Sequence, residues 1–545
     1  MLTGGMTGDE AQRCSPEAGN FLESLSREKR VGKMSTPVPF CVAAERWRML
    51  QASYPDARVE PALRSPDERM WEQADAIREL VRGRIEVTGP ITVTALADLF
   101  RLPNGEIEAA LLALESEGFV LRGKFHPNAQ QLEWCDRRLL ARIHRLTINR
   151  LRAEIQPVTL ADFHRFLVAW QRADSEHRVE GPEGTEFVLE LLDGYEIPAA
   201  AWEPHVLAAR VKEYDPHWLD RLCFTGAIGW GRLSPPQNRL TRAFAPLRSS
   251  PISLFLRENL PHWLHLSDPP SAEFSSDTRE VLNILLESGA LFFRELVSRT
   301  KLLPSRVEQA LGELASQGWV TADSFDGLRA LLVPSEKRAP FADLGRKRHH
   351  KPVTSIASAG RCTLLRRETE IPAAVAPAST QTGGREQAVE VYALALLRRY
   401  GVMFRRLLGR ESLSATWFEL GRVYRRLEAR GEIRGGYFVS GVSGEQFARP
   451  EAIGLLRGIR KKERAGELVV VSAADPLNLV GVLSPGGRVP AFSGNRILLR
   501  DGVPIAALEG ENVRRFDSAD GFAQEEIERA LIVGKLPASL RPYYS

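Results

Sequence analysis

Eleven arginines between Arg385 and Arg434 are the residues of this chain whose type and spacing most directly suggest chemistry. The same stretch holds six glutamates, so its net charge is eleven minus six, or +5, whereas the whole chain of 545 residues carries only +4. Guanidinium groups bind phosphate oxygens through charge-assisted hydrogen bonds. The stretch therefore predicts contact with a nucleic-acid backbone, and the alternative is an arginine-rich face that only keeps helices solvated.

The elements that must position these arginines have a winged helix-turn-helix order. Two segments repeat apolar residues at i, i+3, i+4 and i+7, which predicts two amphipathic helices: Val389, Tyr392, Ala393 and Leu396, then Leu420, Val423, Tyr424 and Leu427. A short helix around Phe404 to Leu408 lies between them. Gly435 and Gly436 then predict the turn of a β-hairpin wing, because glycine accepts positive φ at both turn positions.

The predicted nucleic-acid contacts share a basic side chain on this module or in the linker before it. They are Arg398, Arg399, Arg405, Arg406, Arg410, Arg422, Arg425, Arg426, Arg430 and Arg434, with Arg346, Lys347 and Arg348 of the linker. The arginines of the third helix point away from its apolar face, and Arg434 is at the wing, which suits phosphates on both sides of a groove. Trp417 and Tyr437 could stack on bases or pack in the core.

The same residues resemble a known family. The run LEARGEIRGGYFVSGVSGEQFARPEAIGLLR, followed by VVVSAADPLNLVGVLSPGGRVPA, resembles the C-terminal region of the large helicase-related (Lhr) bacterial DNA helicases. Earlier segments at 42–57, 133–171 and 215–233 agree in order and spacing. The resemblance implies a DNA-binding module of DNA repair that self-associates into a homo-oligomer, binds single-stranded or duplex DNA, and works with a helicase motor carried by a separate polypeptide.

That family region is also similar to DNA glycosylases of the AlkZ type, so the resemblance leaves a second function open, the metal-independent excision of uracil or an alkylated base. Such chemistry uses a carboxylate or amide to orient water or to support a developing oxocarbenium ion. Asp475 is the one carboxylate of the C-terminal module that we select as a catalytic candidate, although an Asp before Pro is also a common turn former.

Neither an ATPase loop nor a metal site is evident in the sequence. No Gly-x-x-x-x-Gly-Lys-Ser/Thr run occurs, so we expect no ATP hydrolysis and no cofactor. The five cysteines lie far apart without zinc spacing, and no stretch of 18 apolar residues occurs. These features predict a cytoplasmic protein, nucleoid-associated at most, that makes no membrane contact.

Internal repetition predicts the architecture. Seven residues recur at an offset of 200, which indicates one unit used repeatedly: Leu96, Ile107, Glu108, Ala110, Leu111, Leu114 and Gly118 match Leu296, Val307, Glu308, Ala310, Leu311, Leu314 and Gly318. We predict a mostly α fold with small β-hairpins, a tandem array of winged helices, and a C-terminal antiparallel, barrel-like β-module. The predicted segments are a disordered 1–39, winged helix 40–130, winged-helix-like 131–272, winged helix 273–333, linker 334–384, winged helix 385–458 and β-module 459–545.

Overall fold

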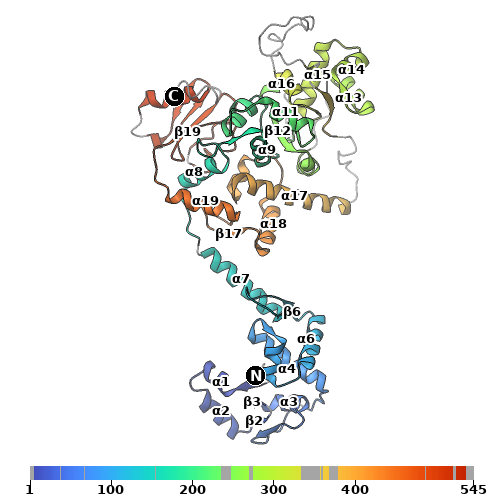
Figure 1. The fold of residues 1–545 in the computed structure, drawn as a ribbon, viewed down its shortest axis with the longest axis vertical. Helices are drawn as coiled ribbons and strands as arrows, with labels where there is room; N and C mark the ends of the chain where they lie inside the picture. The colour runs from blue at the N-terminus through green and yellow to red at the C-terminus, as the bar shows by residue number, and fades with distance from the viewer. Residues whose placement is uncertain are drawn as a thin grey trace. The chain divides into compact units, whose positions relative to one another are not determined.

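The fold divides into two compact units, Met1–Leu151 and Arg152–Ser545. The structure is a computed structural model (Figure 1). It describes residues 5–36, 38–66, 68–153, 155–234, 247–268, 274–332, 356, 360–366, 378–484, 486–519 and 523–535. The predicted linker cluster Arg346, Lys347 and Arg348 lies outside these residues.

The first unit begins with a four-stranded sheet of order β1-β3-β2-β4 and three helices. Its elements are β1 (Met6–Thr7), α1 (Gly8–Cys14), α2 (Ala18–Arg27), β2 (Val31–Thr36), β3 (Phe40–Ala43), α3 (Trp47–Ser53) and β4 (Arg58–Glu60). The predicted disorder of 1–39 is therefore wrong for the described part of that segment. Its composition is polar, but β2 pairs with both β3 and β4, and Met34 is completely buried in the core of the unit.

A winged helix follows in the same unit. Its elements are α4 (Gln73–Thr88), β5 (Ile91–Thr92), α5 (Val93–Phe100), α6 (Asn104–Ser116), β6 (Val120–Gly123) and β7 (Glu133–Asp136). The last strand is the central one, so the antiparallel sheet has the order β5-β7-β6. A long helix, α7 (Arg137–Ala153), leads from β7 into the second unit.

The second unit repeats this topology three times. Each repeat has a three-stranded antiparallel sheet with its last strand in the centre: β9-β12-β11, β13-β15-β14 and β16-β18-β17. Together with the first unit, the described residues thus hold four winged helices. The predicted tandem array is confirmed.

The repeats of the second unit have the following bounds. The first comprises α8 (Leu160–Trp170), β8 (Val179–Glu180), α9 (Gly181–Leu191), β9 (Glu196–Pro198), a π-helical turn Trp202–Leu207, α10 (Ala208–Arg210), β10 (Val211–Lys212), α11 (Pro216–Phe224), β11 (Ile228–Gly231), β12 (Pro251–Leu256) and α12 (Leu260–His265). The next comprises α13 (Ser276–Ser288), β13 (Leu291–Phe292), α14 (Phe293–Thr300), α15 (Pro304–Gln317), β14 (Val320–Ala322), α16 (Asp326–Leu332) and β15 (Arg361–Leu364). The last comprises α17 (Ala378–Tyr400), β16 (Val402–Phe404), the 3-10 helix η10 (Arg405–Arg410), α18 (Trp417–Ala429), β17 (Arg434–Gly436) and β18 (Gln446–Ala448).

The backbone explains the offset of 200. The second helix ends in a left-handed residue in both repeats, at Arg101 (φ 52°) and Lys301 (φ 57°). A left-handed glycine follows the third helix in all four winged helices: Gly118, Gly226, Gly318 and Gly431. These positions turn the chain into the next strand, and glycine adopts the required φ without steric cost.

One strand lies where the sequence predicted a linker. β15 falls inside 334–384 and pairs with both β13 and β14. In its segment RCTL, apolar and polar residues alternate poorly, and the flanking sequence is rich in Pro, Ala and Ser. The local sequence therefore did not predict this strand, which is stabilised by pairing with strands distant in the chain.

The C-terminal module is an open sheet. After α19 (Pro450–Lys461) come β19 (Leu468–Ser472), β20 (Arg496–Arg500), β21 (Val503–Glu509), β22 (Asn512–Arg515) and α20 (Gln524–Lys535). The order β19-β20-β21-β22 leaves β19 and β22 as edges, so the sheet is antiparallel as predicted but does not close into a barrel. One hydrophobic core joins this module to α8, α17 and α18.

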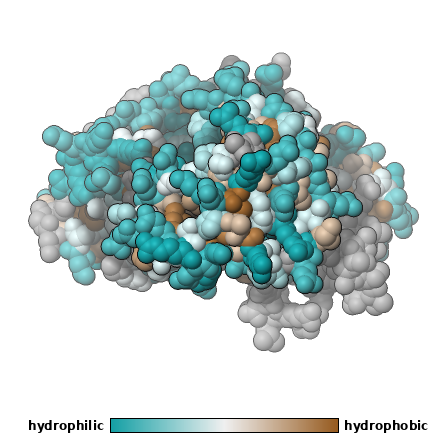
Figure 2. Space-filling model, turned by 90° about the horizontal axis from the view of Figure 1, so that it is seen from below, coloured by the Kyte–Doolittle hydropathy of each residue, from teal (hydrophilic) through white to brown (hydrophobic). Residues whose placement is uncertain are grey.

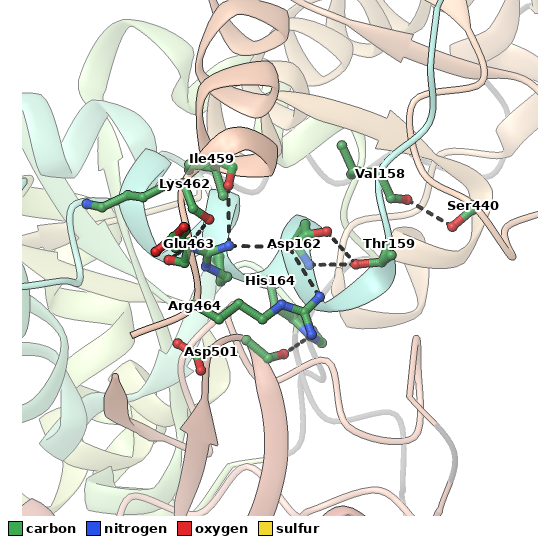
Figure 3. A network of polar contacts seen from close by, with 12 residues as sticks. Val158, Thr159, Asp162, His164, Ser440, Ile459, Lys462, Glu463, Arg464 and Asp501 are labelled. Carbon is green, nitrogen blue, oxygen red and sulfur yellow. Dashed lines mark hydrogen bonds and ion pairs between the residues drawn. The ribbon is translucent and has the colours of Figure 1, made fainter. Parts of the chain in front are cut away.

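Helix α8 connects the last winged helix to this sheet (Figure 3). Arg165 donates hydrogen bonds to the backbone oxygens of Ile459 in the last turn of α19 and of Lys462 and Glu463 just after it. His164 contacts the Gly502 carbonyl through Nδ1 at 2.9 Å, and burial lowers its pKa to about 4. The imidazole is therefore neutral at pH 7, and its Nδ1–H donates to the carbonyl oxygen.

Hydrophilic side chains dominate the face of the molecule drawn in Figure 2, where hydrophobic ones form small patches. Among the residues described, no helix combines the length and the apolar character that crossing a membrane requires.

Candidate nucleic-acid interface

The third helix of the last winged helix, α18, is strongly specified at its start. Thr416 caps it, and the Glu419 side chain accepts the Thr416 backbone N–H in return. Partial burial raises the pKa of Glu419, but hydrogen bonds from Arg385 and Thr416 outweigh it and bring the pKa to about 2. The carboxylate thus stays ionised at the helix N-terminus, where the helix dipole favours negative charge.

One face of α18 is buried and the other carries arginines. Leu420, Tyr424 and Leu427 pack into the core. Arg422 is exposed, and the structure gives it no ion pair with any residue it describes. Phe418, one turn before it, is 71 % exposed, which is unusual for a phenylalanine and places an aromatic ring beside a free guanidinium group.

Two predicted phosphate contacts of α18 already have carboxylate partners. Arg425 pairs with Glu445 of the wing at 2.5 Å, and Arg426 pairs with Glu390 of α17 at 2.7 Å. Both pairs are about half exposed, so solvent screens them and they contribute little to stability. They link α18 to the wing and to α17. Arg422 is therefore the arginine of this helix most available to a ligand.

The third helices of the other repeats have a different character. α6 carries three glutamates and no basic residue. α11 has one arginine and one aspartate. In α15 every residue from Glu313 to Gln317 is buried, and Arg232 of the neighbouring repeat donates to the Ser316 carbonyl. Among the four, α18 alone offers an exposed face with several arginines.

The wing differs from its prediction. Gly435 and Gly436 do not form a hairpin turn but lie within β17, which pairs with β18. A Cβ at Gly435 would collide with the Glu428 carboxylate, and one at Gly436 would collide with the Ile155 side chain. Close approach, and not positive φ, therefore requires glycine here.

The true wing is the loop 437–445. Its inner side is organised by the buried Gln446 side chain, which accepts the N–H groups of Phe438 and Val439 and donates to the Val439 and Val442 carbonyls. Tyr437 is 62 % exposed at the start of the loop, whereas Trp417 packs against Tyr424 with ring centroids 6.0 Å apart.

The remaining predicted arginines separate into surface and interior. Arg405, Arg406 and Arg434 are exposed, and Arg430 lies 3.7 Å from Glu432. Arg398 and Arg410 are half-buried, and each donates to a backbone carbonyl. Arg399 is wholly buried and pairs with Glu411, so its predicted role in nucleic-acid contact is wrong: it lies on the core face of α17.

Asp475 is also interior. Only 2 % of its surface is exposed, and it accepts both guanidinium nitrogens of the buried Arg210 at 2.6 and 2.8 Å. Its Oδ1 also accepts the Leu477 N–H, as expected of an Asp-Pro turn. The catalytic prediction for Asp475 is therefore not supported by its position, since its carboxylate is sequestered from any substrate.

Two surfaces were overlooked in the sequence. Arg457 and Lys461 of α19 are exposed, and the run RGIRKKER was their signal. The second is α7, whose sequence RRLLARIHRLTINRLRA has six arginines and no acid. Charge counted over a single window beginning at Arg385 could not show either of them.

Comparison with known proteins agrees with this architecture. Residues 158–245 and 382–468 each match a winged-helix domain of the large helicase-related protein. The chain is 29 % identical to the "Lhr helicase/ probable uracil glycosylase" of Mycolicibacterium smegmatis, over 98 % of this chain and 35 % of that one. It is 27 % identical to the Escherichia coli "Lhr helicase/uracil glycosylase", over 89 % of this chain and 32 % of the relative.

A solved structure of the Streptomyces sahachiroi DNA glycosylase AlkZ also matches, with a TM-score of 0.36, 13 % identity, and coverage of 70 % of this chain and 97 % of that one. The chain spans about one third of the length of its two curated relatives. Two of the winged helices of this chain are thus similar to winged-helix domains of the large helicase-related (Lhr) protein, and most of the chain is similar to part of two relatives that bear the Lhr name.

Proposed function

We propose that the chain is a DNA-binding module of DNA repair, and that its last winged helix makes the contact through α18 and the wing. The observation that carries the proposal is the contrast among four helices of the same topology, of which α18 alone has an exposed arginine face. A winged helix places its third helix in the major groove and its wing beside the phosphate backbone.

In this proposal the arginines have different roles. Arg422 and the exposed ring of Phe418 face outward from α18 and would reach the groove. Arg405 and Arg406 begin η10 and would bind the backbone. Arg425 is paired with Glu445 of the wing, so it is less available to a phosphate than Arg422 is.

Salt-dependent affinity tests this function. Fluorescence anisotropy with labelled duplex and single-stranded DNA, between 50 and 200 mM salt, should give a steep linear dependence of log K on log salt. Replacing Arg405, Arg406 and Arg422 by alanine should lower the slope for duplex by about 2 to 3, because each lost phosphate contact accounts for roughly 0.9.

A matched control is available on another winged helix. Alanine at Arg279, Arg294 and Arg299 removes the same charge from the exposed surface of α13 and α14. That variant should bind as the wild type does. Equal affinity and equal slope in all three proteins would contradict the proposed interface.

The resemblance adds three expectations to this proposal. The residues of this chain contain no ATP-binding loop, so DNA binding by them should be unaffected by ATP, and we propose that they work with a helicase motor carried by a separate polypeptide. We also propose that the protein is cytoplasmic and a homo-oligomer. Sedimentation of the purified chain tests the last point.

The names of both curated relatives favour a second function, uracil excision from DNA. Incubation with uracil-containing single-stranded and duplex DNA, followed by alkaline cleavage of abasic sites, would reveal it without added metal or nucleotide. If no base is released, DNA binding remains as the proposed function. Because Asp475 is paired inside the fold, we expect Asp475→Asn to lower the melting temperature and to leave any base release per folded molecule unchanged.

A further inference from the structure

Helix α7 has a composition found in no other helix that the structure describes. Its seventeen residues include six arginines and one histidine and no Asp or Glu. It is also highly exposed: from Ala141 to Thr147 every residue is exposed, including Ile143 at 36 % and Leu146 at 55 %. A helix with so little packing gains little stability from burial, so packing does not explain why its residues are so strongly basic.

Four of its six arginines form one stripe. Arg138, Arg142, Arg145, Asn149 and Arg152 follow one another at alternating steps of four and three residues, which places them on the same side of the helix. The fourteen steps from Arg138 to Arg152 span roughly 21 Å at 1.5 Å per residue. Arg152, at one end, is held by Glu428. Arg138, Arg142 and Arg145 are exposed, and within the described ranges they have no ion pair.

Solvation alone explains this stripe poorly. Several other arginines on helices of this chain pair with acidic residues, such as Arg78 with Asp75 and Arg426 with Glu390. On α7 the neighbours at i+4 and i+3 are again arginines. Like charges at this spacing destabilise an isolated helix by about 0.2 to 0.5 kcal/mol per pair. A bound polyanion would remove this repulsion, whereas a neutral partner would not.

We propose that α7 is a second DNA-binding element of this protein, which contacts the phosphate backbone through Arg138, Arg142 and Arg145 without reading bases. The inference rests on the proposed function of α18 and extends it. Arginine on a straight helix supplies forked donors that match phosphate oxygens. Because phosphates are the same at every base pair, a contact made through them should be indifferent to sequence.

The test is a triple variant, Arg138→Ala, Arg142→Ala and Arg145→Ala, in the full chain. Alanine is the best helix former, so circular dichroism should show the helix unchanged. Anisotropy with two unrelated duplexes of 30 base pairs should show about tenfold or greater loss of affinity near 100 mM salt, and a salt slope lower by about 2 to 3 for both. The Arg→Lys triple variant should keep most of the slope, because it keeps the charge.

The control variant replaces Arg13, Arg27 and Arg48, three exposed arginines elsewhere in the first unit, and changes net charge equally. Wild-type affinity in the α7 variant, or equal loss in the control, would overturn the proposal. If the α7 variant binds normally and the α18 variant does not, the proposed function stands and this inference fails. Retained DNA binding with lost binding to phosphatidylserine vesicles would overturn it in favour of a membrane surface.

Discussion

A guanidinium group binds a phosphate more strongly when no carboxylate competes for it, and this difference separates the arginines of α18. Arg422 has no described partner, whereas Arg425 shares its charge with Glu445. We therefore expect Arg422→Ala to weaken duplex binding several-fold and to lower the salt slope by about 0.9. Arg425→Ala should have a smaller effect in the same anisotropy titration. The reverse ranking would show that the Glu445 pair opens on binding.

Buried titratable groups predict a pH dependence of stability. Burial raises the pKa of Asp193 to about 6, although Asn259, Leu256 and Trp263 donate hydrogen bonds to it. Since the folded pKa exceeds the unfolded value of about 4, the folded state gains less stability from Asp193 as pH rises from 4 to 6. His164, with its pKa lowered to about 4, has the opposite effect over nearly the same range.

The two groups should nearly cancel in the wild type. Asp193→Asn removes one of them, so the free energy of unfolding should rise more steeply from pH 4.5 to 6.5 in the variant, by up to about 3 kcal/mol for two pKa units. Urea unfolding followed by fluorescence at several pH values measures this difference. Parallel profiles in the two proteins would show that Asp193 does not titrate in that range.

At this scale the sequence predicted charge but not pairing. It identified the arginines of α18, yet it could not reveal that Glu390 lies opposite Arg426, 36 residues earlier in the chain, or that Arg399 faces the core. Phe418 was not singled out, because exposure of one aromatic ring is a property of packing and not of periodicity.

At the scale of elements, the glycine after each third helix offers a matched pair. Gly118 and Gly318 occupy equivalent positions with φ of 71° and 83°. A Cβ at Gly118 would meet nothing within 4 Å, whereas at Gly318 it would lie 2.6 Å from the Arg232 carbonyl oxygen. Gly118→Ala should therefore cost about 1 kcal/mol for the left-handed backbone alone, and Gly318→Ala about 3 kcal/mol.

Chemical denaturation of each variant measures these two changes in unfolding free energy. Equal losses of unfolding free energy in the two variants would mean that the Arg232 backbone moves to accommodate the new methyl group. The helices and the C′ glycines were predictable because both depend on local sequence. The wing was misplaced because Gly435 and Gly436 serve close packing against Glu428 and Ile155, and sequence alone cannot distinguish that use of glycine from a turn.

At the scale of the molecule, the two units should unfold separately. Leu50 lies in the core of the first unit and Leu420 in the main core of the second, and both are completely buried. Each Leu→Ala change should remove about 2 to 5 kcal/mol. Calorimetry should show that Leu50→Ala lowers one transition and Leu420→Ala the other. A single transition shifted by both variants would indicate cooperative unfolding.

The tandem array was predictable at this scale because residues that recur at a fixed offset can be recognised in a single sequence, without an alignment of homologues. The open form of the C-terminal sheet was not, since closure depends on strand tilt and register, which period-two patterning does not encode. The division at residue 151 was not predicted either, because α7 continues through it as a regular helix.

The chain entering the second unit also covers the wing from the side. Val158 forms a parallel bridge with Val439, its N–H donates to the Phe438 carbonyl, and its own carbonyl accepts the Ser440 N–H, both at 2.8 Å. Backbone groups at the rim of a small sheet otherwise invite a strand from another molecule. Replacing Val158 by proline removes the N–H that donates to Phe438 and should therefore leave backbone groups of the wing unpaired. We expect this variant to aggregate and precipitate on storage before it loses any helix content.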